Sequence, residues 1–215
     1  MQAVLWDMDG TLLDPNGSIR GALDAAVAYG GFDPFGEDDV LIGMPLRDIL
    51  RTRTQDDDVI EAMVEEFRRV SYEETWRMVA WYPGIRETLA WCRDQGLKTA
   101  VVTTKGELEA EVLLEKLDAR HLFDAVVGDD DVRALKPDPA PVLEACRRLG
   151  VAPRNAVMVG DTCYDVDAGR AAGCATIGVG WGHGRGAHGA GHADHVVDHE
   201  VALLRTLQEL AGHNP

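Results

Sequence analysis

Short apolar runs alternate with helix-like segments from residue 85 onward, and this alternation constrains the fold more than any other feature of the chain. The apolar runs have the length of buried strands, and the segments between them carry apolar residues at helical spacing. Strands are predicted at residues 98–102, 125–127, 156–159, 176–179 and 195–197, with helices at 85–95, 107–117, 140–149, 165–172 and 201–211. Such an alternation predicts an α/β fold, with a parallel-sheet Rossmann-like core and helices on both faces.

The region between the first strand and residue 84 has a different character. Helical periodicity covers residues 18–29, 37–53 and 56–76, and no strand-like alternation interrupts it. The Pro-Gly pair at 83–84 then ends the region and marks the return of the chain. We therefore expect residues 14–83 to form a small inserted helical subdomain, while residues 1–13 and 84–215 form the core.

The chain is strongly acidic, with a formal net charge of −16 over 215 residues. Nucleic acids and anionic membrane surfaces bind basic faces, so neither is an expected partner. No apolar run has the length of a membrane span, and the first residues lack a secretion signal, so we expect a cytoplasmic protein. The four cysteines are scattered, without a CxxC pair, and predict neither a disulfide framework nor a zinc site.

Two acids end the first predicted strand, in the run VLWDMDGTLL at residues 4–13. Asp7 and Asp9 follow an apolar run and precede a turn at Gly10. Two like charges in one small site repel each other and lose hydration, so a divalent cation is the expected compensator. The carboxyl ends of strands are also where open α/β sheets bind ligands. An ordinary strand followed by an acidic turn is the alternative explanation of this run.

Three later motifs also stand where strands are predicted to end. The strand 98–102 leads into a Thr-Thr-Lys sequence, whose hydroxyl and N–H groups suit an oxyanion, although such residues also cap helices. Lys136 lies in LKPDP, where prolines keep it out of a helix, although in isolation a solvated lysine at a helix start is the favoured explanation. The strand 156–159 leads into GDTCYD, where Asp161 and Asp165 repeat the opening pattern. A helix cap would explain Asp165 but not Asp161.

These motifs, in this order, resemble the signature of the haloacid dehalogenase superfamily, and KPDP resembles its phosphoglycolate phosphatase-like branch. The resemblance implies magnesium-dependent hydrolysis of a small-molecule phosphate monoester through an aspartyl-phosphate intermediate. It makes Asp7 the nucleophile and Asp9 the general acid and base. Lys136 would neutralise Asp7 and the incoming phosphoryl group together. Superfamily branches that do not protonate an alkoxide lack an acid at the position of Asp9, so its presence favours phosphate-ester chemistry.

A site built from carboxylates favours a hard cation, and Mg²⁺ is the expected cofactor. Asp7 and Asp161 are the expected side-chain ligands, and the family pattern adds the backbone carbonyl of Asp9. Asp165 is expected to orient neighbours such as Lys136 rather than to bind the metal directly.

Substrate contacts are expected from the core and from the insertion. Thr103, Thr104 and the turn at Gly10 offer hydroxyl and N–H groups to the phosphoryl oxygens. The resemblance makes the insertion a cap that closes over the site and contacts the leaving group. Within it, residues 43–47 resemble the substrate-specificity loop of the family, so Arg47 is expected to bind a second anionic group. A surface arginine on a helix is the equal alternative.

Two other functions remain open on the sequence alone. One is a sugar-phosphate mutase resembling β-phosphoglucomutase, which the absence of lysine from residues 14–83 disfavours. The other is a non-catalytic binding protein on the same fold, which the intact motif residues disfavour. Both a monomer and a homodimer are compatible with the sequence. The glycine- and histidine-rich segment 178–195 is interpreted as a flexible loop rather than a second metal site.

Overall fold

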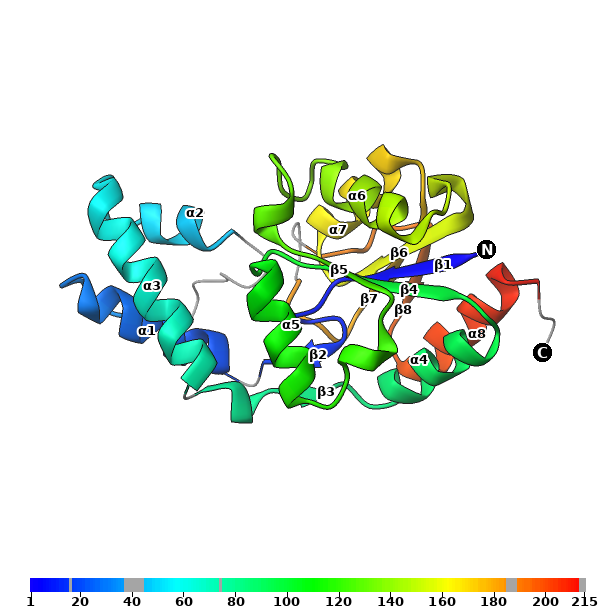
Figure 1. Ribbon diagram of the computed structural model, residues 1–215, viewed down its shortest axis with the longest axis horizontal. Coiled ribbons are helices and arrows are strands. Elements are labelled where there is room, and N and C mark those ends of the chain that lie inside the picture. The colour runs from blue at the N-terminus through cyan, green and yellow to red at the C-terminus, as the bar shows by residue number, and fades with distance from the viewer. Residues whose placement is uncertain (16, 37–44, 74, 185–188, 213–215) are drawn as a thin grey trace.

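Parallel strands form the central sheet of the computed structural model, which describes residues 1–15, 17–36, 45–73, 75–184 and 189–212 (Figure 1). The strand order is β5-β4-β1-β6-β7-β8. The strands are β1 (Ala3–Trp6), β4 (Lys98–Val102), β5 (Ala125–Val127), β6 (Ala156–Gly160), β7 (Ala175–Val179) and β8 (His195–Val197). The predicted α/β fold with a Rossmann-like core is confirmed.

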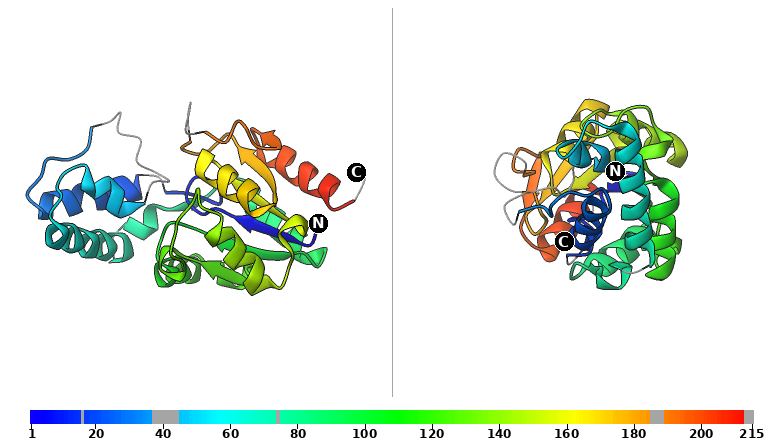
Figure 2. Two further views of the ribbon diagram at one scale, coloured as in Figure 1. Left: turned by 90° about the horizontal axis from the view of Figure 1, so that it is seen from above. Right: turned by 90° about the vertical axis from the view of Figure 1, so that its left-hand side faces the viewer.

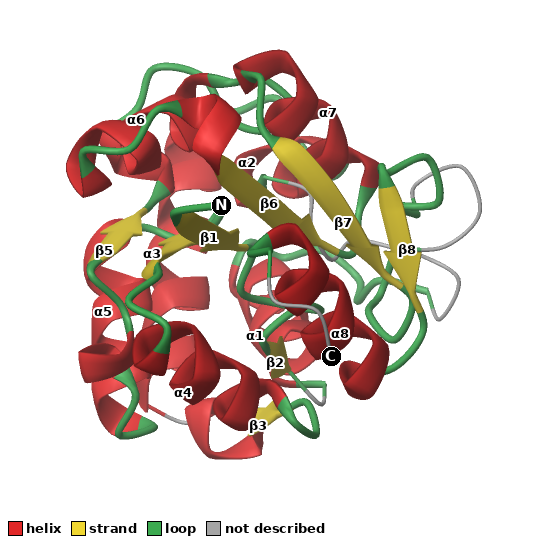
Figure 3. Cartoon of the chain, turned by 90° about the vertical axis from the view of Figure 1, so that its right-hand side faces the viewer, coloured by secondary structure: helices red, strands yellow, loops and turns green. Residues whose placement is uncertain are grey.

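Helices cover both faces of this sheet because its central strand is apolar on both sides (Figure 3). Val4 and Trp6 pack in one hydrophobic cluster with α4 (Ile85–Asp94), α5 (Glu107–Lys116) and α8 (Glu200–Leu210). Ala3 and Leu5 face the other way, into a cluster with α6 (Ala140–Leu149) and α7 (Cys163–Ala172). The strand is therefore fixed from both sides, and so is the position of the residues that follow it.

Three helices form a separate unit at one end of the molecule (Figure 2). They are α1 (Ser18–Tyr29), α2 (Leu46–Arg51) and α3 (Asp57–Glu73). Their buried apolar residues, among them Leu23 and Met63, make a hydrophobic cluster distinct from the two clusters of the core. Residues 37–44 of the predicted helix 37–53 lie outside the described residues, and the described helix is limited to α2.

Two very short strands join the helical unit to the core, in a region where the sequence predicted no strand. β2 (Leu13–Asp14) leads into the unit, β3 (Ala80–Trp81) leads out of it, and the two pair in antiparallel fashion. The entry and the exit of the unit therefore lie side by side, as the two sides of a hinge would.

Short 3-10 helices occupy several of the connections: η1 (Thr75–Met78), η2 (Arg120–Leu122), η3 (Asp129–Asp131) and η4 (Pro153–Asn155). Within the described ranges, no helix combines the length and the apolar character needed to cross a membrane.

Candidate active site

The four predicted motifs converge at the carboxyl ends of the central strands. β1 and β6 are neighbours, with Trp6 paired to Val159, so the residues that follow these strands lie side by side. Asp7 follows β1 and donates its backbone N–H to the carbonyl of Val159, at 2.9 Å. Asp161 follows β6, and Asp165 lies in the first turn of α7. Parallel register therefore brings together acids that are more than 150 residues apart in the chain.

Lys136 lies between two of these acids. Its Nζ donates to Oδ1 of Asp7 and to Oδ1 of Asp165, at 2.6 Å each, and to the carbonyl of Val102 at 3.0 Å. The lysine is only 6% exposed. Burial lowers the pKa of this ammonium, but Asp165 and Asp7 outweigh burial and hold its pKa above 10.5, the ordinary value. Lys136 is thus a fixed positive charge at the centre of the site.

Three buried carboxylates surround a space where a metal ion could be held. Asp7, Asp161 and Asp165 each present an oxygen, and these oxygens lie within 4.8 Å of one another. Burial raises the pKa of Asp7 well above its ordinary value, even though Lys136 opposes that shift. Burial and the charge of Asp165 raise the pKa of Asp161 as well. Three carboxylates against one ammonium fit a hard cation, which prefers oxygen ligands and would supply the missing positive charge.

Asp161 is held in place by the segment after β7. Its Oδ2 accepts N–H bonds from the backbones of His183, at 2.8 Å, and Gly184, at 3.0 Å, and its Oδ1 accepts the Thr11 hydroxyl at 3.2 Å. Gly182 packs so closely that an added Cβ would collide with Asp161. These contacts were not predicted, because the segment was interpreted only as a flexible loop. Residues 185–188, which belong to the same predicted loop, lie outside the described residues.

Asp9 lies apart from the three-carboxylate cluster, with Lys105 as its partner. Lys105 Nζ donates to Asp9 Oδ2 at 2.6 Å, while Asp9 Oδ1 is buried without a hydrogen-bond partner among the described residues. Burial lowers the pKa of the Lys105 ammonium, but Asp9 and then Glu109 outweigh it and raise the pKa overall. Sequence reasoning missed this lysine, although its place directly after a strand end was a usable signal.

The residues predicted to contact substrate differ in where they lie. Thr104 and Arg47 line a cleft between the helical unit and the core, whereas Thr103 is buried, with its hydroxyl accepting the N–H of Lys105 at 3.2 Å. Gly10 has a left-handed φ of 93° and lies against Asp161, where an added Cβ would collide with that carboxylate.

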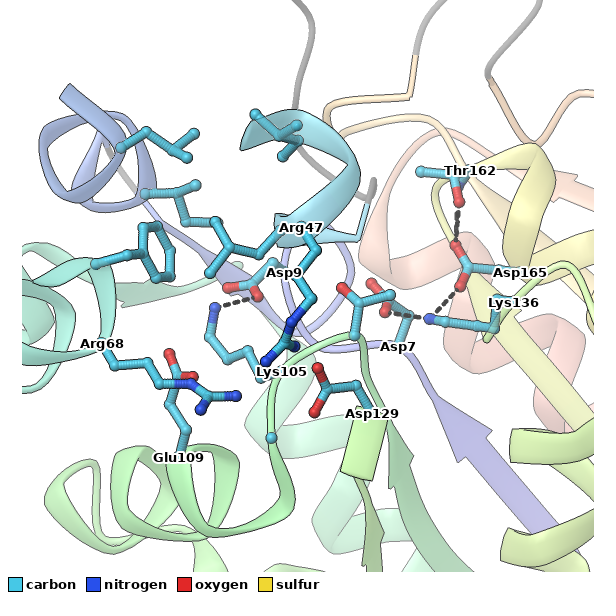
Figure 4. A pocket seen from close by; sticks show the side chains of 17 residues that line it. Asp7, Asp9, Arg47, Arg68, Lys105, Glu109, Asp129, Lys136, Thr162 and Asp165 are labelled. Carbon is cyan, nitrogen blue, oxygen red and sulfur yellow. Dashed lines mark hydrogen bonds and ion pairs between the residues drawn. The ribbon is translucent and has the colours of Figure 1, made fainter. Parts of the chain in front are cut away.

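The cleft is a hollow of about 750 Å³, including its open mouth, and it contains the catalytic candidates at its base (Figure 4). Its apolar wall comes from the helical unit, for example from Ile19, Leu46 and Phe67. Its far polar wall includes Arg68, Glu109 and Asp129, none of which the sequence singled out. No local pattern marks these three residues, because they meet only when the helical unit folds against the core.

The fold is that of an α/β enzyme, and its candidate active site consists of carboxylates and a lysine at the carboxyl ends of parallel strands. The chain belongs to the haloacid dehalogenase-like hydrolases, because that family matches residues 4–179.

Relatives of the chain are phosphatases. The phosphoglycolate phosphatase of Aquifex aeolicus is 36% identical over 185 residues, which are 85% of this chain and 86% of the relative. The pyrophosphatase PpaX of Bacillus mycoides is 32% identical over 215 residues, covering 99% of each chain. The crystal structure of a predicted phosphoglycolate phosphatase from Haemophilus somnus matches with a TM-score of 0.84 and 25% identity, covering 97% of this chain and 98% of the other. The expected superfamily, its phosphoglycolate phosphatase-like branch and the phosphatase class are thereby confirmed.

Proposed function

We propose that this protein hydrolyses a small-molecule phosphate monoester, with Mg²⁺ as cofactor and an aspartyl-phosphate intermediate on Asp7. The observation that supports this most strongly is the position of Asp7 within the cluster. One of its oxygens accepts the Lys136 ammonium, and its other oxygen has no hydrogen-bond partner among the described residues. A buried carboxylate with a free oxygen beside a fixed cation is suited to attack an anionic phosphoryl group.

In the first step, the free oxygen of Asp7 forms a bond to phosphorus, and the bond from phosphorus to the leaving oxygen breaks. The leaving oxygen keeps the electron pair of that bond and takes a proton from Asp9. Oδ1 of Asp9 is the oxygen available to carry this proton, because Oδ2 accepts Lys105. Lys136 stabilises the negative charge on the phosphoryl oxygens throughout.

In the second step, water attacks phosphorus and gives its proton to Asp9, while the Asp7 carboxylate leaves. Asp9 is then protonated again and ready for the next ester, so the cycle balances. The Lys105 contact would hold Oδ2 of Asp9, while Oδ1 has no hydrogen-bond partner among the described residues and is the oxygen left for both transfers.

The side chains of Asp7 and Asp161 would hold Mg²⁺ together with the backbone carbonyl of Asp9, and Asp165 would orient Lys136. When bound, the cation neutralises charge on the phosphoryl oxygens and on the clustered carboxylates. The residues present fit this ion because their donor atoms are all oxygens and because burial raises the pKa of Asp7 and of Asp161, a cost that a bound cation would offset.

We further propose that residues 14–83 act as a cap, hinged at β2 and β3 and distinct from a core of residues 1–13 and 84–215. The cap side of the cleft supplies apolar side chains and two arginines, so closure would exclude water from the phosphoryl group. A mutase needs groups that hold a sugar phosphate in two orientations, and no contact among the described residues of the cleft favours that alternative.

The proposal is tested with p-nitrophenyl phosphate in the presence and absence of Mg²⁺. We expect turnover that chelation abolishes and Mg²⁺ restores, and a loss of at least about 1000-fold in kcat for Asp7→Asn. Asp118→Asn is the matched control, because the Asp118 side chain is 95% exposed and lies outside the site. Acid-quenched protein should carry a phosphoryl group on the peptide that contains Asp7. A folded parent protein without turnover, or an active Asp7→Asn, would refute the assignment.

A further inference from the structure

Lys105 is a nearly buried cation at the edge of the site, and the phosphoryl contacts proposed above do not include it. It follows β4, whereas Asp9 follows β1, and these neighbouring strands pair in parallel with Trp6 opposite Val101. Lys105 Nζ donates to Oδ2 of Asp9 at 2.6 Å, and the two side chains are 13% and 12% exposed. The contact thus joins two residues of the core whose positions follow from strand register.

The backbone of Lys105 is held on both sides. Its N–H donates to the Thr103 hydroxyl at 3.2 Å, and its carbonyl accepts the N–H of Asp129 at 2.8 Å. The side chain therefore extends from a defined point just beyond β4. Moving the ammonium away from Asp9 would leave two nearly buried charges unpaired, which is costly. A contact of this kind keeps its partner in one place.

Asp9 has no second support for its carboxylate among the described residues. Oδ1 is buried without a hydrogen-bond partner, so within the described ranges the side chain accepts only the bond from Lys105. Asp165 differs, because it accepts Lys136 on one oxygen and the hydroxyl and N–H of Thr162 on the other. The orientation of Asp9 is therefore expected to depend on Lys105.

The two lysines of the site contact different acids. Figure 4 shows Lys136 bound to Asp7 and Asp165, and Lys105 in a separate pair with Asp9. Among the described residues, no hydrogen bond joins the side chains of these two groups. In the proposed mechanism, the nucleophile and the general acid thus have separate cationic partners.

We propose that Lys105 is a positioning residue for the general acid, which holds Asp9 for proton transfer and takes no direct part in capturing the phosphoryl group. The inference rests on the proposed phosphatase function and extends it to a residue outside the reacting groups. Loss of Lys105 should slow the two proton transfers that depend on Asp9 more than it slows the attack of Asp7 on phosphorus. A residue that only supports the fold would affect all of these steps.

The test compares phenyl phosphate with p-nitrophenyl phosphate, which have similar shapes but different leaving groups. Phenoxide is the stronger base, so its departure depends more on the proton from Asp9. In Lys105→Met, the ratio of kcat/KM for p-nitrophenyl phosphate to that for phenyl phosphate should rise about tenfold or more, because kcat/KM reports formation of the intermediate. Lys98→Met is the matched control, since Lys98 is exposed at the opposite end of β4 and should leave the ratio unchanged.

Two further variants separate positioning from a loss of fold. Lys105→Arg keeps a cationic donor, so its ratio should lie closer to that of the parent than the ratio of Lys105→Met does. Asp9→Asn removes the acid itself, and adding Lys105→Met to it should not raise the ratio further, because both changes act on the same proton transfer. An equal loss for both esters in Lys105→Met, or effects on the ratio that add in the double variant, would overturn the assignment.

Hydrolysis of the aspartyl phosphate gives a readout that does not involve the leaving group. Water gives its proton to Asp9 in this step, so phosphorylated Lys105→Met should lose its phosphoryl group about tenfold more slowly than the parent does. Acid quenching at intervals after the substrate is diluted out measures this rate. Equal rates in parent and variant would overturn this inference alone. A folded parent protein that hydrolyses neither ester would instead refute the proposed function.

Discussion

Lys136 carries the only positive charge that directly contacts two members of the three-carboxylate cluster among the described residues. Removing one partner of a buried ion pair leaves the other charge buried and unpaired, which costs about 3–5 kcal/mol. We therefore expect Lys136→Met to lower the free energy of unfolding by about 3 kcal/mol in metal-free buffer near neutral pH. Chemical denaturation measures this difference.

The pH dependence of this stabilisation has a definite sign. Because the pKa of Lys136 is raised in the folded protein, its contribution is complete below 10.5 and declines only as the pH rises beyond that value. In Lys136→Met, lowering the pH should restore part of the lost stability, because protonation neutralises the carboxylates that the substitution leaves unpaired. A Lys136→Met protein as stable as the parent at neutral pH would contradict the structure. Lys98→Met, at an exposed residue, serves as the control.

Replacing Asp7 is expected to change the free energy of unfolding in the opposite direction to replacing Lys136. Its pKa is raised on folding, so the folded protein binds this proton more tightly than the unfolded chain does. Metal-free stability should therefore fall as the pH rises above 3.8, the ordinary value, until the folded carboxyl is ionised. Asp7→Asn removes that charge while keeping an acceptor for Lys136, so the metal-free variant should be more stable near neutral pH, by on the order of 1 kcal/mol.

Thermal melts with and without Mg²⁺ check this prediction. The parent should gain stability on adding Mg²⁺, and Asp7→Asn should gain much less, because one ligand is missing. The difference between parent and variant in metal-free buffer should shrink toward acid pH, where Asp7 is protonated. A variant that is less stable than the parent in metal-free buffer at all pH values would show that Asp7 is not a source of repulsion.

Residues that follow strands could be predicted from the sequence, whereas residues that meet across the cleft could not. Asp7 and Asp161 stand directly after apolar runs, so parallel register alone indicates that they are neighbours. Arg47 lines the cleft, but its partner Glu61 lies 14 residues away on another helix, and the sequence did not indicate this pair. Pairs of that kind depend on how two helices pack, which no local pattern specifies.

The segment after β7 positions Asp161, and its glycine allows a direct test. An added Cβ at Gly182 would collide with Asp161 and with the carbonyl of Gly10. We expect Gly182→Ala to destabilise the protein by about 1–3 kcal/mol and to weaken Mg²⁺ binding, because the carboxylate must shift. Gly191→Ala is the matched control, since the space around Gly191 is open. Mg²⁺ titrations read by thermal shift measure the affinity of each variant. Equal affinities for the two variants would show that the segment does not position Asp161.

The strands and helices of the core could be predicted from the sequence because their apolar runs and helical spacing are visible along the chain. The strand β4 was predicted with its observed bounds, since its apolar run is continuous. The pair β2 and β3 was missed, because two residues cannot show alternation and the partners lie far apart in the chain. Their pairing becomes visible only once the helical unit is seen to leave and rejoin the core at one place.

At the scale of the whole molecule, the active site lies where two separately packed bodies meet. The helical unit has its own hydrophobic cluster, and the core has two, so we expect each to keep its internal packing if the proposed closure changes the cleft between them. The residues proposed for chemistry belong to the core, whereas the apolar wall of the cleft belongs to the cap. We therefore expect the register of the core strands to position the reacting groups, and the contact between the helical unit and the core to determine which leaving groups fit.

The net charge of −16 should oppose the approach of a phosphate dianion, and salt should relieve that opposition. Raising ionic strength from about 0.01 M to about 0.15 M shortens the screening length from about 30 Å to about 8 Å. Distant surface carboxylates are then screened, whereas Lys136 and the proposed cation act at contact distance and are screened much less. At saturating Mg²⁺, kcat/KM for a dianionic ester should therefore rise about twofold or more with added KCl, while kcat changes little. A steady fall in kcat/KM, with folding unchanged by circular dichroism, would mean that local positive charge at the cleft dominates the approach instead.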